Sequence, residues 1–310
     1  LGTRLDTKST GSPIITFARE AKKIMIDIDP FELSKFNYFG LIFDILIQDD
    51  LKNLFKCFDN KLEINKQDFH NKNWLSQISS WKKEFKIIDK SHSEEDINYI
   101  DPYKFFEILS KKIATNTSLF IDTGCSIAWA MQAMKFKKGV RIFHDFNNTA
   151  MGWALPALIG GHFADESREK LCISGDGSFM MTMQELATVL HHKIKLKLIV
   201  INNSGYSMIK QTQDQWLNSN YVASSKEGGL SFPKYKDVSK AFGLDYIELS
   251  QNSEIDNKVN KFLISKRPVL LNLKISETAR VKPQVKFGRP NEDMEPLLPR
   301  NIFHKNMIIR

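Results

Sequence analysis

Short apolar runs alternate along this chain with segments whose apolar residues recur at helical spacing, and this alternation is typical of an α/β fold. The clearest stretch covers residues 171–205. It predicts a strand at 171–174, a helix at 178–191 and a second, β-branched strand at 196–201. A glycine turn follows the first strand and an asparagine-rich turn follows the second. The stretch therefore predicts a βαβ unit with parallel strands.

The same criteria predict further elements on both sides of this unit. Strands are expected at 23–28, 41–47, 118–121, 141–143, 245–249 and 269–274. Helices are expected at 49–58, 101–113, 126–134, 235–242 and 253–264, and residues 147–161 predict a loop that enters an apolar helix. The helix at 101–113 has a clear start signal, because Asp101 stands directly before Pro102.

These elements divide the chain into four parts. Residues 101–276 hold enough of them for a doubly wound parallel α/β sheet, whereas residues 1–60 hold too few for a complete sheet and predict only part of an α/β domain. Residues 61–100 are polar and predict a linker with one amphipathic helix, whose apolar stripe is Trp74, Leu75, Ile78, Trp81 and Phe85. Residues 277–310 carry four prolines and little periodicity, and predict an extended C-terminal arm.

Two polar turns in the βαβ unit suggest chemistry. Gly175-Asp176-Gly177 ends the first strand and Asn202-Asn203 ends the second, and the carboxyl ends of parallel strands share one edge of a sheet. A carboxylate and an amide oxygen suit Mg²⁺, which often takes further oxygens from phosphates. The backbone N–H groups of Gly177 and Ser178 lie at the start of the helix, where binding of an anion is favoured. Gly-Asp-Gly alone also fits a capped tight turn, but the second turn favours a metal–diphosphate site.

The motif GDGS, followed after about 26 residues by NN, resembles the signature of thiamine diphosphate enzymes. The chain is similar to the acetolactate synthase-like members of the pyruvate decarboxylase superfamily, in their C-terminal portion. The resemblance implies that Asp176, Asn203 and the Gly205 carbonyl hold Mg²⁺. It also implies cofactor contacts from Gly124, Cys125, Ser126, Gly175, Gly177, Ser178, Tyr206 and Met208, although acetolactate synthases usually have Gln-His at the positions of Cys125-Ser126.

Three further roles follow from the resemblance. Met151 corresponds to the bulky apolar residue that bends the cofactor, and the Thr149 carbonyl would bond its 4′-amino group, although relatives are usually glycine-rich in this loop. Read without the resemblance, Met151 would be a core methionine. Ile209 is apolar as in synthases, where pyruvate decarboxylases commonly place a glutamate. Thr212 stands where branched-chain synthases place a substrate-selecting tryptophan.

The expected function is therefore decarboxylation of a pyruvate-like 2-oxo acid and ligation of the product to a second carbonyl, dependent on thiamine diphosphate and Mg²⁺. The alternatives are a non-oxidative 2-oxo acid decarboxylase, or a catalytically silent fragment or cofactor-binding subunit. The family's activating glutamate belongs to an N-terminal pyrimidine-binding domain that we do not find in these residues. The resemblance thus implies a homodimer or homotetramer, or a separate chain that carries that domain.

The start of the chain resembles the latter half of the family's Rossmann-like central domain, which binds FAD in flavin-containing relatives. Gly2 and Arg4 occupy the matching loop, before the sequence IDIDP. Most of a flavin site would precede Leu1, so FAD binding has only weak support.

Composition narrows the partners and the compartment. The net charge is +8 and the pI is near 9.2, but Lys and Arg are spread along the chain among Asp and Glu, and this distribution argues against a nucleic-acid partner. No apolar run approaches the ~18 residues of a membrane span and no signal peptide is evident. Three unpatterned cysteines suggest reduced thiols, so we expect a cytoplasmic protein.

Overall fold

The structure is a computed structural model that describes residues 1–61, 71–87 and 99–308. The chain divides into two compact units. Unit 1 contains Leu1–Phe85 and Lys282–Arg310, and unit 2 contains Lys86–Val281. This division places the predicted amphipathic helix and most of the predicted C-terminal arm in unit 1.

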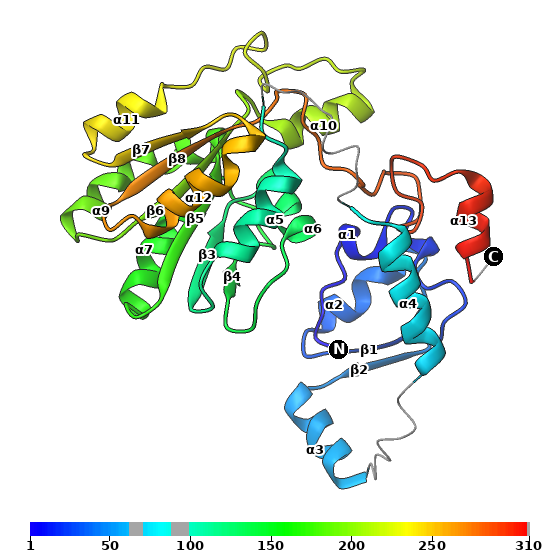
Figure 1. Cartoon of the computed structure of the whole chain (residues 1–310). Coiled ribbons are helices and arrows are strands. Elements are labelled where there is room, and N and C mark those ends of the chain that lie inside the picture. Colours follow the sequence, from blue (N-terminus) through cyan, green and yellow to red (C-terminus); the bar gives the residue numbers. More distant parts are fainter. Residues whose placement is uncertain (62–70, 88–98, 309–310) are drawn as a thin grey trace. The chain divides into compact units, whose positions relative to one another are not determined.

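Unit 2 is built on a six-stranded sheet in which all neighbouring strands are parallel (Figure 1). The strand order is β4-β3-β5-β6-β8-β7. The strands are β3 (Thr117–Ile121), β4 (Arg141–Phe143), β5 (Glu169–Gly175), β6 (Lys197–Asn202), β7 (Asp245–Leu249) and β8 (Val269–Lys274). The predicted strands at 141–143, 245–249 and 269–274 are confirmed to the residue, and the others within about two residues.

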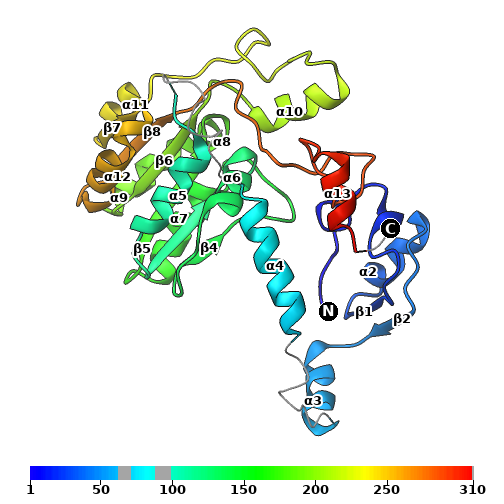
Figure 2. The same cartoon turned by 45° about the vertical axis from the view of Figure 1, so that its right-hand side comes forward.

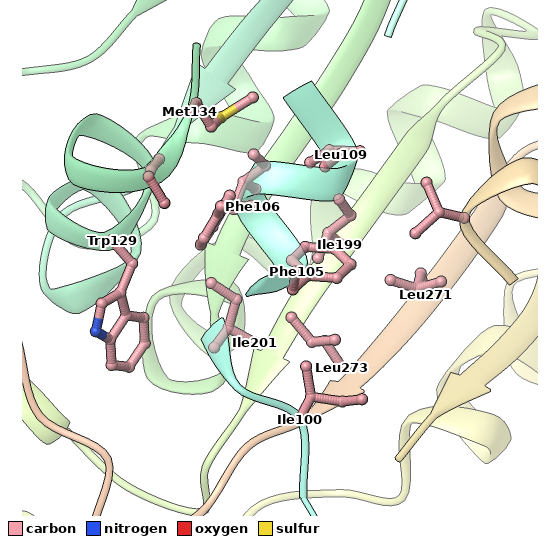
Figure 3. Close-up of a cluster of buried hydrophobic side chains, with 14 of the residues drawn as sticks. Ile100, Phe105, Phe106, Leu109, Trp129, Met134, Ile199, Ile201, Leu271 and Leu273 are labelled. Atoms are coloured by element: carbon pink, nitrogen blue, oxygen red, sulfur yellow. The ribbon is translucent and has the colours of Figure 1, made fainter. Parts of the chain in front are cut away.

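Helices cover both faces of this sheet. One face packs against α5 (Pro102–Lys112), α6 (Cys125–Ala133) and α12 (Ile255–Ile264), where Phe105, Trp129, Ile199 and Leu271 belong to one buried cluster (Figure 3). The other face packs against α7 (Ala154–Ala164), α8 (Asp176–Thr182), α9 (Leu186–His191) and α11 (Tyr235–Ala241).

The strands supply both clusters because successive side chains point to opposite faces. In β6, Ile199 and Ile201 belong to the first cluster, whereas Leu198 and Val200 belong to the second. All four are at most 1% exposed, which explains the continuous apolar run of this strand. The predicted doubly wound parallel α/β fold is confirmed.

The predicted single helix at 178–191 is wrong. A 3₁₀ turn at Met183–Glu185 separates α8 from α9. Thr182 leaves the helical region with φ −136° and ψ 18°, and its hydroxyl donates to the Gly152 carbonyl oxygen at 3.1 Å. The apolar periodicity continues across the break because Phe179 and Leu186 pack in the same cluster.

The predicted start of α5 is confirmed. The Asp101 carboxylate accepts hydrogen bonds from the backbone N–H groups of Tyr103 (2.7 Å) and Lys104 (3.0 Å), while Pro102 occupies the first turn. The predicted strand at 41–47 forms only in its second half.

Unit 1 contains a small parallel sheet of β1 (Ile24–Asp27) and β2 (Ile45–Gln48), with α2 (Pro30–Ser34) against it (Figures 1 and 2). Its core cluster is Met25, Leu33, Phe36 and Leu41. The remaining described helices of unit 1 are α1 (Thr7–Thr10), a 3₁₀ turn (Ile14–Thr16), a 3₁₀ helix (Lys35–Phe39), α3 (Leu51–Lys61), α4 (Lys72–Glu84) and α13 (Arg300–Asn306). The sequence does not predict α13.

The C-terminal segment of unit 1 is fixed to its N-terminal part by polar contacts. Asn291 donates to the Ser9 carbonyl oxygen at 2.8 Å, and Arg19 forms an ion pair with Glu292 at 2.7 Å. Among the residues that the structure describes, no helix has both the length and the apolar character needed to cross a bilayer.

Candidate functional site

Several predicted site residues meet at the carboxyl edge of the large sheet in unit 2. A Cβ built on Gly175, at the end of β5, would lie 3.6 Å from the Ser126 hydroxyl oxygen of α6. A Cβ built on Gly124 would lie 3.9 Å from the Cβ of Met208 in α10 (Ser207–Trp216). The turns after β3, β5 and β6 are therefore in close contact, as the parallel topology predicts.

Asp176 is the polar centre of these turns. It is 1% exposed, and its carboxylate accepts hydrogen bonds from the backbone N–H groups of Gly177 (2.8 Å), Asn203 (3.1 Å) and Gly205 (3.2 Å). Burial raises the pKa of this carboxyl to about 7, although the same backbone donors oppose that shift. A buried carboxylate with a raised pKa is a candidate ligand for a cation.

The side chain of Asn203 shows what that cation would meet. One of its two terminal amide atoms lies 2.7 Å from the Gly205 carbonyl oxygen and 3.3 Å from Asp176 Oδ2, and the other contacts the Ser207 hydroxyl. If the first atom is nitrogen, it donates to both acceptors. The neighbouring acceptors favour nitrogen at this position when no metal is bound, and a rotated amide would instead place its oxygen beside these two oxygens, an arrangement that needs a cation.

With the amide rotated in this way, the oxygens of Asp176, Asn203 and Gly205 would form an oxygen cage that fits Mg²⁺. Neighbouring ligands on an octahedron with bonds of about 2.0–2.1 Å lie about 2.9 Å apart, which the two observed separations bracket. In the described part of the chain, no group of three His, Cys, Asp or Glu side chains could hold a metal. Beyond the Asp176 carboxylate, a cation here would therefore rely on neutral oxygens and on oxygens of a bound anion.

Two glycines are required by the backbone of these turns, one for close packing and one for its conformation. A Cβ on Gly177 would lie 2.1 Å from Cε1 of Tyr206, so glycine lets the tyrosine ring pack against the start of α8. Gly124 has φ +89° and ψ −150°, a conformation that favours glycine, and no side chain of its own caps α6. Because glycine has no side chain, Gly124 cannot cap the backbone N–H groups of Cys125 and Ser126 at the start of α6.

The Cys125 thiol is not a nucleophile of this site. Burial raises its pKa to about 12, so the thiol stays protonated at neutral pH. Ser126 and Ser178 are also buried, with 3% and 5% exposure. The N–H of Gly177 is used by Asp176, so it is not directed to an external anion in this state.

Met151 and Thr149 lie on the loop between β4 and α7. Met151 is 37% exposed and belongs to neither core cluster of unit 2, so the alternative interpretation as a core methionine is wrong. Thr149 has φ +50°, which is uncommon for a residue with a side chain. Asp145 stabilises this turn, because its carbonyl oxygen accepts from the Thr149 N–H at 2.9 Å.

The proposed substrate-side residues lie on α10. Ile209 is 47% exposed, and the exposed Thr212 donates its hydroxyl proton to the Met208 carbonyl oxygen at 3.1 Å. The sequence did not predict that Lys210 is buried. Lys210 is 3% exposed, and its ammonium nitrogen lies 3.5 Å from the Glu277 carbonyl oxygen. Its helical position alone gave no signal of burial.

A second residue without an assigned role is Asp122, which directly follows β3. It is 1% exposed, and burial raises the pKa of its carboxyl despite hydrogen bonds from Ser174 and from the backbone of 152–154. An acid directly after an apolar strand was the available signal. Nothing in the sequence showed which groups it contacts.

Comparison with known proteins decides the class of this domain. Residues 122–273 match the family described as "Thiamine pyrophosphate enzyme, C-terminal TPP binding domain". This segment belongs to that family. The asparagine, the aspartate and the glycine of the oxygen cage all lie inside the matched segment of this thiamine pyrophosphate-binding domain. The resemblance in the GDGS and NN motifs is confirmed.

Curated relatives extend the similarity to nearly the whole chain. The chain is 28% identical over 297 residues to an acetolactate synthase large subunit from Cyanidium caldarium, covering 95% of this chain and 48% of the relative. It is 28% identical over 296 residues to the large subunit from Porphyra purpurea, with the same coverage. It is 27% identical over 300 residues to acetolactate synthase 1, chloroplastic, from Zea mays, covering 95% and 46%. The chain spans about half the length of the curated relatives it matches.

The contact between Gly177 and Tyr206 gives a prediction for the thiamine pyrophosphate-binding domain. We expect Gly177→Ala to lower its stability by about 1–3 kcal/mol, because the new methyl group overlaps the tyrosine ring. Urea unfolding would measure this loss, and adding Tyr206→Ala should relieve part of it. The control is Gly160→Ala in α7, where a Cβ meets nothing within 4 Å. An equal response of the two alanine variants would contradict the close contact.

Proposed function

We propose that the chain forms the metal- and diphosphate-binding part of an acetolactate synthase-like enzyme. The enzyme would decarboxylate a pyruvate-like 2-oxo acid and join the product to a second carbonyl. The observation that carries this proposal is the convergence of the Asp176 carboxylate, the Asn203 amide and the Gly205 carbonyl within a thiamine pyrophosphate-binding domain. The names of the relatives support the reaction type.

In this proposal, Asp176, Asn203 and the Gly205 carbonyl hold Mg²⁺, and the metal neutralises the diphosphate. Gly175, Gly177 and Ser178 border the diphosphate on one side, and Gly124, Cys125 and Ser126 border it on the other. Tyr206 and Met208 pack beside these turns and limit the space. When bound, thiamine diphosphate supplies the electron sink for decarboxylation and carbon–carbon bond formation.

The loop between β4 and α7 would act at the other end of the cofactor. Met151 presents a bulky apolar side chain that is accessible to a ligand, and the positive φ of Thr149 turns the backbone beside it. We propose that Met151 holds the cofactor in its bent form and that the Thr149 carbonyl accepts from its 4′-amino group.

The residues of α10 favour ligation over simple decarboxylation. Ile209 offers no proton to an intermediate, and its exposed apolar side chain borders the proposed substrate side. Thr212 has a smaller side chain than the tryptophan that branched-chain synthases place at this position. We therefore propose the class of the substrate, a 2-oxo acid, and no particular member of it. Product analysis separates the candidates, because a synthase forms a hydroxy-keto acid and a decarboxylase forms an aldehyde.

We also propose that a pyrimidine-binding domain, from a second copy or a separate chain, completes the site. Large apolar side chains are exposed on the loop and helices that carry the candidate site, including Met151, Met181 and Ile209. Such exposure is typical of surfaces that a protein partner covers. Flavin binding at Gly2 and Arg4 has weaker support, since Arg4 already lies 3.6 Å from Glu32.

The first test concerns the metal. We expect tight thiamine diphosphate binding only with Mg²⁺, and we expect Asp176→Ala to weaken it at least about 100-fold, since it removes the charged ligand of the cage. Isothermal calorimetry with Mg²⁺ and with excess chelator would measure both effects. Asp237→Ala, at an exposed position in α11, is the control. Equal affinity with and without chelator would exclude the proposed metal role.

The second test concerns Met151. In the assembled enzyme, Met151→Ala should lower kcat about 100-fold while changing cofactor affinity much less, because a cofactor displaced by about 1 Å reacts far more slowly. Steady-state kinetics and calorimetry would separate the two effects. The control is Met131→Ala in α6, which truncates a methionine with 48% exposure. Unchanged kcat in the Met151 variant would show that the residue does not set the cofactor geometry.

The third test concerns assembly. The acids on the loops after β3 and β4 are already engaged, Asp122 with the start of α7 and Asp145 with the 145–150 turn, so neither is placed as the activating acid. We expect these 310 residues alone to consume pyruvate at least about 100-fold more slowly than the chain with an added pyrimidine-binding domain. Assays with Mg²⁺ and thiamine diphosphate would compare them. Full turnover by the chain alone would contradict the shared site.

A further inference from the structure

The buried carboxylate of Asp122 connects the Met151 loop with the strand that leads to Asp176. The proposed function assigns these two parts to opposite ends of the cofactor. Asp122 Oδ1 accepts from the backbone N–H groups of Trp153 (3.0 Å) and Ala154 (3.4 Å) at the start of α7. Asp122 Oδ2 accepts from the Ser174 hydroxyl at 2.6 Å. Its own N–H donates to the Ile173 carbonyl oxygen at 2.8 Å.

On one side of Asp122 is the loop of Met151. Helix α7 begins after Trp153, and no cap from the Trp153 side chain satisfies its first N–H groups. Because these groups are otherwise unpaired in a helix, the carboxylate at the end of β3 caps α7 from a different part of the chain. Met151 is two residues before the capped N–H of Trp153, so the cap fixes the end of its loop.

On the other side is the strand that leads to the oxygen cage. Ser174 is two residues before Asp176, and it is 1% exposed. Asp122 is thus bonded to β5 through both its backbone and its side chain. Asp122 is 1% exposed, and three donors hold its carboxylate in place. The distance between the Met151 loop and the cage can therefore vary little.

We propose that Asp122 is a positioning residue that sets the Met151 loop at a fixed distance from the metal cage. The inference rests on the proposed function, because it assigns the two loops to opposite ends of one cofactor. As a positioning residue, Asp122 would not touch the cofactor. Its loss should leave the cage able to bind metal and diphosphate, but should let the Met151 loop shift.

Hydrogen exchange tests the mechanical link without any cofactor. Asp122→Ala should speed amide exchange in residues 149–154 of the chain, while exchange in 203–208 stays as in the wild type. Asp122→Asn should restore most of the protection, because the amide oxygen can accept from Trp153 and Ala154 and the amide nitrogen can donate to Ser174. Unchanged exchange at 149–154 in Asp122→Ala would overturn the proposal.

The matched control is Asp101→Ala. Asp101 is also a buried carboxylate at the start of a helix, with 8% exposure, and it accepts from two backbone N–H groups of α5. This variant should speed exchange near 102–105 but not at 149–154. A loss of protection at 149–154 in both variants would mean general destabilisation and would also overturn the proposal.

Kinetics of the assembled enzyme supply the second readout. Asp122→Ala should lower kcat about 100-fold, as for a displacement of about 1 Å, and change the Kd for thiamine diphosphate with Mg²⁺ by less than tenfold. Asp122→Asn should recover kcat, whereas Asp101→Ala should not lower it. Equal losses of kcat in the Asp122 and Asp101 alanine variants would show a merely structural role.

The experiments distinguish failure of the proposed function from failure of the Asp122 proposal. If the wild-type chain binds no thiamine diphosphate with Mg²⁺, the function is wrong, yet hydrogen exchange still reports on the bridge. If Asp122→Ala does not fold, Ser174→Ala replaces it, because it removes only the donor to Oδ2. That variant should give a smaller increase in exchange at 149–154, and no increase would overturn the proposal.

Discussion

The buried carboxylate of Asp176 is the constraint on which the site depends. A carboxylate with 1% exposure is costly unless donors or a cation surround it, and three backbone N–H groups approach it from the turns after β5 and β6. Those turns can meet because β5 and β6 are adjacent parallel strands whose ends coincide at Gly175 and Ile201. The sheet therefore determines where the charge lies, and the charge determines which backbone groups must gather around it. The contact between the Asn203 amide and the Gly205 carbonyl follows from that gathering.

The sheet and the proximity of Asp176 to Asn203 could be predicted from the sequence because both follow from local pattern and topology, whereas the role expected of Gly205 came only from the family resemblance. Apolar runs define β5 and β6, and their parallel pairing then brings Asp176 and Asn203 together whatever lies between them. The break at Thr182 could not be predicted in this way, since the hydroxyl contact with Gly152 comes from a distant loop. The same reason applies to Asp122. Its position after β3 is visible in the sequence, but its partners in α7 and β5 are set only when three separate segments pack.

Burial of polar side chains marks the remaining gap between sequence and structure. Lys210 is 3% exposed in α10, a helix whose neighbouring positions include the exposed Ile209 and Trp216. A lysine at such a position is usually solvated, and only the fold shows that the segment around Tyr221 and Glu277 covers it. Periodicity reports which face of a helix is apolar. It does not report whether a later loop of the chain returns to cover a polar face.

The two ends of the site differ in how firmly the domain holds them. The proposed metal end is enclosed, because Asp176, Asn203 and Ser178 are each at most 5% exposed, whereas Met151 at the proposed opposite end is 37% exposed. An enclosed cage can bind its ligand with little help from a partner, but an exposed side chain can set the geometry of a ligand only if its backbone is fixed. The backbone of the Met151 loop is fixed at one end by Asp122 and in its turn by Asp145. Rigid support from inside the domain thus accompanies an open side at the proposed reactive end, and the proposed pyrimidine-binding domain could then exclude water without having to align the loop itself.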